Sequence, residues 1–419
     1  MKSLFFNYNR IYDLEMEYGS SFYLLHVNKL RDNYKKIENA FKSRYENFLI
    51  GYSYKTNYLP YLCKEIDKLG GYAEVVSRLE YDLALKIGVK ANKIIFNGPV
   101  KTFDDIETAL KSGSILNIDS MYEVDYVERI CLEHQGIQFK IGIRVNFNLT
   151  KDGENLLQEG YEASRFGICE ENGDLSYAIK RLKNIKNLSI IGLHSHFSTK
   201  NREISSYKKT TKFLCNIAKE QLIDTVEYID IGGGIYGEIP ESFQIDAPTF
   251  DDYAEAICGI MNEEFALFKK KPFLVLEPGM SMVANTIFFI AKVVEVKQIR
   301  ELNFVFVDGS VHNIKPTMHK RNLPIQHVKG NHLSADKGLY HIVGYTCMEK
   351  DYLAHDIAGD LPKKNDYFIF ENVGAYTIVF NPPFIKERPS IVALDGNQTF
   401  AVRKKETIKE FFNEDIYSF

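Results

Sequence analysis

Residues 48–57 read Phe48-Leu49-Ile50-Gly51-Tyr52-Ser53-Tyr54-Lys55-Thr56-Asn57, an apolar run that ends at a lysine. The run has the length and composition of a buried strand, which places Lys55 at the C-terminal end of that strand. Apolar and aromatic neighbours exclude water from an amine and make it easier to deprotonate. A neutral amine at this position can form a Schiff base with an aldehyde cofactor. The alternative is an ordinary solvated lysine at a strand end.

Strand-like runs recur through the first two-thirds of the chain. After the first run they lie at Tyr72–Val76, Lys93–Phe96, Ile115–Ile118, Phe139–Val145, Ser189–His194, Val226–Ile231 and Phe273–Leu276. Amphipathic segments such as Phe103–Lys111 and Glu123–Leu132 separate them, with apolar residues at helical spacing. Strands that alternate with helices in this way favour a (β/α)8 barrel of the TIM type. An open doubly wound sheet is the alternative.

The pattern changes after Glu277, where short strands follow one another with little helix between them. They are expected at Thr286–Val296, Phe304–Val307, Tyr367–Phe370, Tyr376–Phe380 and Ser390–Leu394. We therefore predict two domains, a barrel over residues 26–275 and a mainly β domain that combines residues 1–25 with 276–419.

Composition limits the classes of function. The 419 residues suffice for two domains, and a formal net charge of −4 gives no reason to expect nucleic acid as a partner. No apolar run approaches the length of a membrane span, and the N-terminal sequence lacks the apolar stretch of a signal peptide. The six cysteines have no metal-ligand spacing. These features predict a cytoplasmic protein with reduced thiols, no bound metal and no membrane partner.

Several polar residues follow the expected strands and would meet at one end of the barrel. Gly232, Gly233 and Gly234 follow the seventh strand and leave backbone N–H groups for an anion, although a tight turn also requires glycine. Glu277 directly follows the eighth strand. It could serve as a cofactor ligand, a salt-bridge partner or a cap. His194 and His196 end the sixth strand, and alternation predicts that only one of them points into the mouth. Arg144 ends the fifth strand and could pair with a phosphate, a carboxylate of the substrate or a neighbouring acid.

Eight short motifs in order along the chain resemble the fold-type III pyridoxal-phosphate decarboxylases. They are Tyr54-Lys55-Thr56-Asn57, Glu74–Glu80, Ser164–Gly167, Gly192–Phe197, Gly232–Gly234, Glu277-Pro278-Gly279, Tyr345–Asp351 and Gly374–Thr377. The family includes ornithine and diaminopimelate decarboxylases, and the resemblance covers nearly the whole chain. It implies the fold of alanine racemase and ornithine decarboxylase and the cofactor pyridoxal 5′-phosphate.

The resemblance also implies roles for individual residues. Lys55 would hold the cofactor aldehyde and later move protons, and Glu277 would keep the pyridine nitrogen protonated. The glycines Gly232–Gly234, with Tyr376, would bind the cofactor phosphate. His196 would stack on the cofactor ring, and Cys347 would return a proton to the α-carbon after CO2 leaves.

The remaining contacts implied by the resemblance involve the cofactor and a second subunit. Glu74, Arg144 and Thr199 are also expected to bind the cofactor. Cys347 and Asp351 would enter the active site of the partner in a homodimer, where Asp351 would pair with Arg165.

The reaction implied is removal of the α-carboxylate of an amino acid. Glu277 argues for this reaction because a carboxylate stabilises a protonated pyridine ring, whereas the related racemases place an arginine there. The alternatives are a diaminopimelate decarboxylase that makes lysine, an amino-acid racemase, and an inactive homologue that regulates a partner.

The chain departs from the family pattern at the expected substrate residues. Met280 replaces the arginine that usually follows Glu-Pro-Gly, and Met348 replaces the acid that binds a distal amine in diamine-forming members. Glu349 could partly substitute for that acid. Lys315 and His319 stand in place of the arginine and tyrosine that bind the distal carboxylate of diaminopimelate. We therefore expect a small substrate, an amino acid or a conjugated amino acid, that is neither free ornithine nor ordinary meso-diaminopimelate.

Overall fold

Eight parallel strands close into a barrel in the computed structural model, which describes residues 6–151, 153–332 and 336–419. In order around the barrel they are β2 (Phe48–Ser53), β3 (Tyr72–Val75), β4 (Ile94–Phe96), β5 (Ile115–Ile118), β6 (Phe139–Asn146), β10 (Leu188–His194), β11 (Tyr228–Asp230) and β12 (Phe273–Leu276). The pairing of β12 with β2, with Leu276 opposite Ile50, closes the ring. The predicted barrel is therefore confirmed, and the open sheet is excluded.

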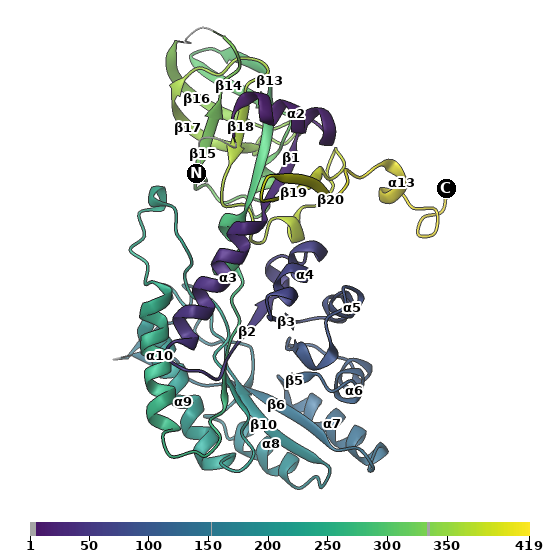
Figure 1. Ribbon diagram of the computed structural model, residues 1–419, viewed down its shortest axis with the longest axis vertical. Helices are drawn as coiled ribbons and strands as arrows, with labels where there is room; N and C mark the ends of the chain where they lie inside the picture. Colours follow the sequence, from purple (N-terminus) through teal and green to yellow (C-terminus); the bar gives the residue numbers. More distant parts are fainter. Residues whose placement is uncertain (1–5, 152, 333–335) are drawn as a thin grey trace. The chain divides into compact units, whose positions relative to one another are not determined.

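Helices follow the barrel strands along the chain (Figure 1). They are α4 (Pro60–Lys68), α5 (Arg78–Lys86), α6 (Phe103–Lys111), α7 (Met121–Glu133), α8 (Asp174–Lys183), α9 (Ile204–Gln221) and α10 (Phe250–Glu264), while α3 (Val27–Lys42) precedes the first strand. Two of these helices begin with capping boxes, in which Thr102 and Thr249 bond to the backbone of the first turn. The caps fix where these helices start and so set the lengths of the loops that carry the site.

Tyr228 fills the barrel interior together with Ile95, Ile191 and Val275. Its hydroxyl donates a hydrogen bond to Asn117 Oδ1 at 2.7 Å, so the buried phenol is satisfied. A Cβ atom at Gly192 would lie 2.1 Å from the Tyr228 ring, and this close approach explains the glycine in the middle of a strand.

The second compact unit is built on a mixed sheet. Its strands are β1 (Phe22–His26), β13 (Ile287–Ile299), β14 (Leu302–Val307), β15 (Ile325–Val328), β16 (Lys337–Val343), β17 (Tyr352–Asp360), β18 (Tyr367–Phe370), β19 (Ser390–Asp395) and β20 (Gln398–Arg403). The strand β1 pairs antiparallel with β13 and parallel with β19, which ties the N-terminal segment into this sheet. The helix α2 (Tyr8–Tyr18) packs its buried residues Ile11 and Leu14 into the same core.

Contacts divide the chain into these two units. The barrel unit contains Arg31–Ile239 and Gln244–Met282. The β unit contains the N-terminal segment through Leu30, Pro240–Phe243 and the chain from Val283 onward.

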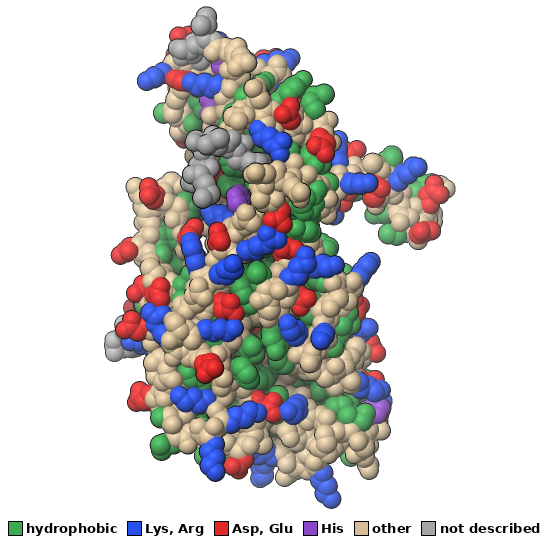
Figure 2. All heavy atoms as spheres, in the orientation of Figure 1, with side chains coloured by type: hydrophobic (Ala, Val, Ile, Leu, Met, Phe, Trp, Pro, Cys, Tyr) green, Lys and Arg blue, Asp and Glu red, His purple; other side chains and the backbone are tan. Residues whose placement is uncertain are grey.

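One predicted strand is wrong. Residues 376–380 contain a bend and the 3-10 turn Ile378–Phe380 instead of a strand, because Tyr376 has a φ of 54°, which no strand accommodates. The helix α2 and the strands β15, β16, β17 and β20 were not predicted. Within the described residues, no helix combines the length and apolar character of a membrane span. Acidic and basic side chains are interspersed on the face seen in Figure 2.

Candidate active site

The barrel unit brings the predicted residues to the ends of neighbouring strands. Lys55 follows β2 in a 3-10 turn, the glycines 232–234 follow β11, and Glu277 follows β12. The carboxyl ends of parallel strands lie at one rim, which in barrels of this kind carries the active site.

The Lys55 amine is held by an ion pair. Its Nζ lies 2.6 Å from Glu74 Oε2 and 3.3 Å from Ser53 Oγ. The Glu74 side chain is buried, and it also accepts a hydrogen bond from the Ser53 hydroxyl. The sequence predicted apolar and aromatic surroundings for this amine, and the structure adds the buried Glu74 side chain as its ion-pair partner.

Glu277 is buried at the mouth, and its two carboxylate oxygens have different neighbours. Oε1 accepts a hydrogen bond of 2.6 Å from Asn97 Nδ2, and Oε2 lies 3.4 Å from His194 Nε2. Burial alone would raise the pKa of Glu277. The charges of His194 and Lys55 and a hydrogen bond from Asp230 outweigh it and hold the pKa below its ordinary value. Glu277 is therefore a carboxylate that can face a cationic group.

Asp230 is a site residue that the sequence analysis missed. It ends β11 two residues after Tyr228, so both side chains point to the barrel interior. Burial, and then the neighbouring Glu277 carboxylate, raise the pKa of Asp230 well above its ordinary value. The protonated Asp230 can donate to Glu277, which leaves Glu277 as the charged member of the pair. The signal in the sequence was an acid in an otherwise apolar strand.

The glycine loop keeps fewer free N–H groups than predicted. Gly232 N donates to Asp230 Oδ1 at 2.9 Å, and Gly233 N donates to His196 Nδ1 at 3.2 Å. In the described part of the chain, the Gly234 N–H has no hydrogen-bond acceptor. The glycines are also required sterically, since a Cβ atom at Gly233 would lie 2.0 Å from the carbonyl oxygen of Glu277.

Both histidines face the mouth, so the prediction that only one does is wrong. The strand β10 ends at His194, and the alternation of side chains does not extend to His196. Burial and the cation of Arg144 lower the pKa of His196 to about 3. His196 therefore presents a neutral ring whose Nδ1 accepts from Gly233, which leaves the proton on Nε2.

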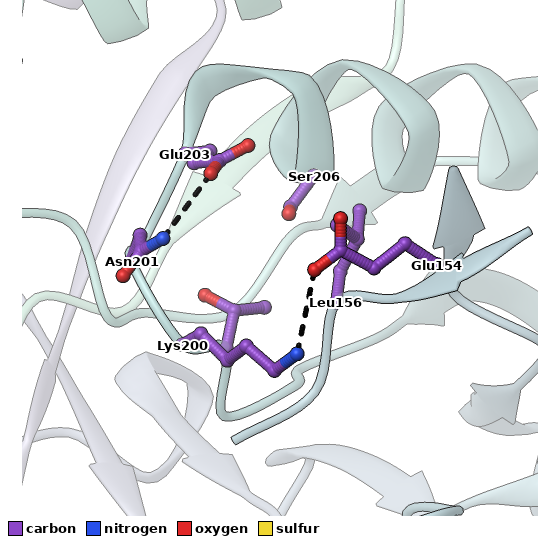
Figure 3. A pocket seen from close by; sticks show the side chains of 7 residues that line it. Glu154, Leu156, Lys200, Asn201, Glu203 and Ser206 are labelled. Atoms are coloured by element: carbon purple, nitrogen blue, oxygen red, sulfur yellow. Dashed lines mark hydrogen bonds and ion pairs between the residues drawn. The ribbon is translucent and has the colours of Figure 1, made fainter. Parts of the chain in front are cut away.

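Arg144 and Thr199 have contacts within the protein. Arg144 lies 3.1 Å from Asp119 Oδ1 and donates to the carbonyl oxygen of His196 at 3.2 Å, so of its three expected partners the structure supplies the neighbouring acid. Thr199 forms an isolated antiparallel β-bridge with Leu157 and lines a pocket of about 290 Å³ beside the start of α9. In Figure 3, side chains from β8 (Glu154–Asn155), the loop 200–203 and α9 converge on this pocket.

The residues predicted to act from a second subunit lie in the β unit. Cys347 is exposed in the connection between β16 and β17. Asp351 is buried and accepts hydrogen bonds from Val311 N, Thr346 N and the Thr346 hydroxyl, so it fixes this connection. Met348 is half-buried and Glu349 is exposed.

Lys315, His319 and Tyr376 also belong to the β unit. Lys315 is buried, and this burial lowers its pKa to about 8. The pKa of His319 is lowered by burial and then by the charge of Lys315. The Tyr376 ring stacks with Phe380 at a centroid distance of 6.1 Å.

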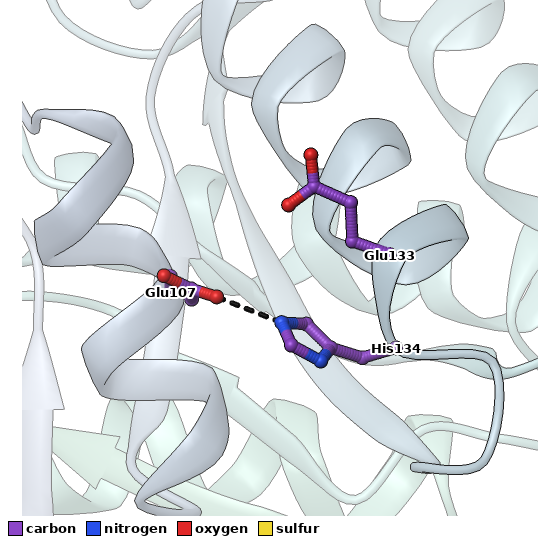
Figure 4. Close-up of side chains that lie close together, drawn as sticks. All are labelled: Glu107, Glu133 and His134. Carbon is purple, nitrogen blue, oxygen red and sulfur yellow. Dashed lines mark hydrogen bonds and ion pairs between the residues drawn. The ribbon is translucent and has the colours of Figure 1, made fainter.

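A group of potential metal ligands lies on the outer helices α6 and α7 and at the residue that directly follows α7. Glu107 and Glu133 approach His134 there (Figure 4). Glu107 accepts hydrogen bonds from His134 at 2.7 Å and from Lys111 at 3.1 Å, so its charge is already compensated.

The residues at the barrel mouth fit pyridoxal phosphate. Lys55 offers a primary amine for the aldehyde, Glu277 a buried carboxylate for the ring nitrogen, and Gly234 an unbonded N–H for phosphate. This set of donors and acceptors defines a pyridoxal-phosphate enzyme built on a barrel.

Comparison with known proteins identifies the family. Residues 27–284 match the pyridoxal binding domain of the pyridoxal-dependent decarboxylases, and the chain belongs to this family. It is a pyridoxal-phosphate-dependent amino-acid decarboxylase.

Relatives of similar length share this architecture. The chain is 27% identical to diaminopimelate decarboxylase of Methanocaldococcus jannaschii over 96% of its own length and 93% of that protein. It is 26% identical to the Aquifex aeolicus diaminopimelate decarboxylase, with 94% and 91% covered. The crystal structure of the M. jannaschii enzyme superposes with a TM-score of 0.87 and covers 97% of this chain and 94% of that one. A single-residue mutant of the Helicobacter pylori diaminopimelate decarboxylase, complexed with L-lysine, is 25% identical, with a TM-score of 0.82 and coverage of 97% and 99%.

Proposed function

We propose that this decarboxylase acts on an amino acid whose distal end is acidic or acylated and carries no free ammonium group. The observation that carries the proposal is Lys315, which is buried and has no carboxylate partner among the described residues. A buried charge without a partner is costly, so an anionic group of the substrate would stabilise the ammonium.

The surroundings of Lys315 support a distal anion. Burial, and then the charge of Lys315, lower the pKa of both His319 and His355. Three basic groups thus lie close together in the β unit, and a negative charge is what they would attract.

The expected site for a distal ammonium supports the same substrate class. Met348 offers no charge, and Glu349 is exposed. An ammonium group placed against Met348 would lose its hydration without gaining a counter-charge.

We further propose the roles of the residues at the mouth. Lys55 binds the cofactor aldehyde and moves protons at the α-carbon, and Glu277 keeps the ring nitrogen protonated. The backbone of Gly234 holds the phosphate, and the neutral ring of His196 packs against the cofactor. Bound pyridoxal phosphate supplies the electron sink that makes loss of CO2 possible.

Cys347 would supply the proton that replaces the lost carboxylate, from the second subunit of a homodimer. Its exposure is consistent with insertion into a partner's site, and Asp351 holds its loop in shape. Arg165 is exposed and forms no ion pair with another described residue, so it is available to a partner.

Diaminopimelate is the second candidate substrate, because the relatives described above are diaminopimelate decarboxylases that match along nearly their whole length. Three residues that depart from the family pattern at the distal end, Lys315, His319 and Met348, weigh against it.

Comparing kcat/KM for several amino acids would test the proposal. The panel contains glutamate, α-aminoadipate, succinylated lysine, meso-diaminopimelate, lysine, ornithine and arginine. We expect turnover of an acidic or acylated member and a loss of about tenfold or more in Lys315→Met, because a charge-assisted hydrogen bond is removed.

Lys364→Met, an exposed lysine of the same unit, is the matched control and should leave kcat/KM unchanged. Rapid turnover of meso-diaminopimelate, with no preference for the acidic and acylated members, would refute the proposal and support the second candidate.

A further inference from the structure

Arg202 lies in the loop after β10, immediately before α9. Its two terminal guanidinium nitrogens are each 3.8 Å from the Met280 sulfur, and its guanidinium carbon lies 4.9 Å from the centre of the Tyr236 ring. Tyr236 belongs to the loop after β11, and Met280 follows Glu277 after β12. Arg202 therefore brings a cation to the place where three loops of the barrel mouth meet.

This cation lacks a counter-charge. Among the residues described by the structure, no carboxylate forms an ion pair with Arg202. A thioether is only a weak acceptor, and an aromatic ring engages the face of the guanidinium and leaves its N–H edge available. The side chain is half-buried, so part of its hydration is also lost.

Tyrosines of the surrounding helices hold Arg202 in position. The Tyr253 hydroxyl donates to the backbone carbonyl of Arg202 at 2.6 Å, and the Tyr253 and Tyr207 rings contact each other edge to face at 5.1 Å. The Tyr207 hydroxyl in turn donates to the carbonyl of Gly233 at 3.1 Å. The backbones of Arg202 and of the glycine loop are thus fixed by one pair of tyrosines.

The neighbouring backbone is also suited to an anion. The N–H group of Gly234 has no acceptor in the described part of the chain, whereas the Tyr236 N–H donates to the Tyr253 hydroxyl. A guanidinium and a backbone N–H group without an acceptor are both suited to the oxygens of a phosphate or a carboxylate.

We infer that Arg202 is an anion-binding residue of the active site, which takes either the cofactor phosphate or a carboxylate of the substrate. It places a cation against Met280, the position where the family pattern has arginine. The inference rests on the cofactor of the family and does not depend on the distal group proposed for the substrate.

Two binding measurements separate the sources of the anion. The first is titration of the cofactor-free protein with pyridoxal phosphate, followed by absorbance, with inorganic phosphate as a competitor. The second is titration of the loaded protein with L-glutamate, followed by the change in cofactor absorbance. The variants are Arg202→Met, Arg202→Lys and the double variant Arg202→Met with Met280→Arg.

We expect Arg202→Met to weaken one of these affinities by about tenfold or more. A higher Kd for pyridoxal phosphate and weaker competition by phosphate would assign the cofactor phosphate. A higher Kd for glutamate with unchanged cofactor binding would assign the substrate carboxylate. The double variant should recover much of the loss, because it returns a guanidinium to the same place, and Arg202→Lys should recover less because lysine lacks the planar fork.

Arg129→Met is the matched control, since Arg129 lies on α7 in an exposed pair with Glu133 and should affect neither affinity. Thermal unfolding checks that each variant folds. If Arg202→Met does not fold, the affinities of Arg202→Lys decide the test. Less than a twofold change in both affinities in the folded variant would overturn the inference. An unchanged kcat/KM in Lys315→Met would not affect the inference about Arg202.

Discussion

At the residue scale, the ionisation of a single carboxylate decides what the barrel mouth can do. Glu277 is buried and charged, and Asp230 beside it holds the proton of the pair. A charged carboxylate stabilises a protonated pyridine ring, which is the form that withdraws electrons most strongly.

Replacing Glu277 by glutamine should lower kcat by about a hundredfold, because a neutral amide gives up the electrostatic stabilisation of the reacting state. Asp230→Asn is the matched control. It keeps an oxygen for the Gly232 N–H and an uncharged group beside Glu277, so its kcat should fall far less. Steady-state kinetics of the loaded variants measures both effects, and equal losses in the two would contradict the assignment of the charge.

The sequence predicted Lys55 and Glu277 because both directly follow apolar strands, and strand ends meet at one rim. It did not predict how they are paired. Asn97 and Glu277 are 180 positions apart in the chain, and the 2.6 Å bond between them depends on the closure of the barrel. Arg202 was missed for the same reason, since its relation to Met280 exists only in three dimensions.

At the element scale, buried charges fasten the loops and helices that surround the mouth. Lys101, in the loop before α6, lies 3.0 Å from Glu123 on α7, and neither side chain is exposed. Glu123 also accepts a hydrogen bond from Asp119 N, and Asp119 pairs with Arg144. This connected set fixes Arg144, which in turn bonds to the carbonyl of His196.

Replacing Lys101 by methionine should lower the unfolding free energy by about 3–5 kcal/mol, because Glu123 is left as a buried charge without its partner. The double variant with Glu123→Gln removes that charge and should recover part of the loss. Denaturant unfolding measures both, and equal stabilities of wild type and Lys101→Met would show that the pair contributes nothing.

Glu80 on α5 predicts a pH dependence of stability. Burial raises the pKa of Glu80 to about 7, from an ordinary value of 4.5. The folded protein therefore binds this proton more tightly than the unfolded chain, so the contribution of Glu80 to stability falls as the pH rises from 4.5 to about 7.

Replacing Glu80 by glutamine keeps an acceptor for the Val76 N–H and removes the charge. The variant should exceed wild type in unfolding free energy at pH 8 by up to about 3 kcal/mol, with the difference vanishing below pH ~4.5. Urea unfolding at several pH values measures this difference. A constant difference across the pH range would mean that Glu80 does not titrate as described.

Element prediction succeeded in the barrel and was weaker in the β unit. In the barrel, apolar runs alternate with amphipathic segments, and this pattern allows few assignments other than alternating strands and helices. In the β unit, strands such as β15 are short and polar, and the apolar run near residue 376 looks like a strand until its left-handed backbone conformation is known.

At the scale of the whole molecule, the proposed homodimer can be tested by mixing inactive subunits. Lys55→Ala and Cys347→Ala should each be inactive or nearly so as pure proteins. If Cys347 acts in the partner's site, exchange at equal ratio gives mixed dimers with one intact site, and the mixture should reach about a quarter of wild-type activity.

The control mixes the double variant, with both changes in one chain, with wild type under the same conditions. Mixed dimers that it forms keep no intact site, because each site lacks either Lys55 or Cys347. No recovery from the two single variants, after subunit exchange has been verified, would contradict the shared site.

Release of labelled CO2 from C1-labelled amino acids shows whether Lys55 at the barrel mouth carries out cofactor-dependent decarboxylation. We expect release by the protein loaded with pyridoxal phosphate, preferentially from an acidic or acylated amino acid, and none by Lys55→Ala. Equal release by Lys55→Ala, or solvent exchange at the α-carbon of wild type with the carboxylate retained, would contradict this expectation.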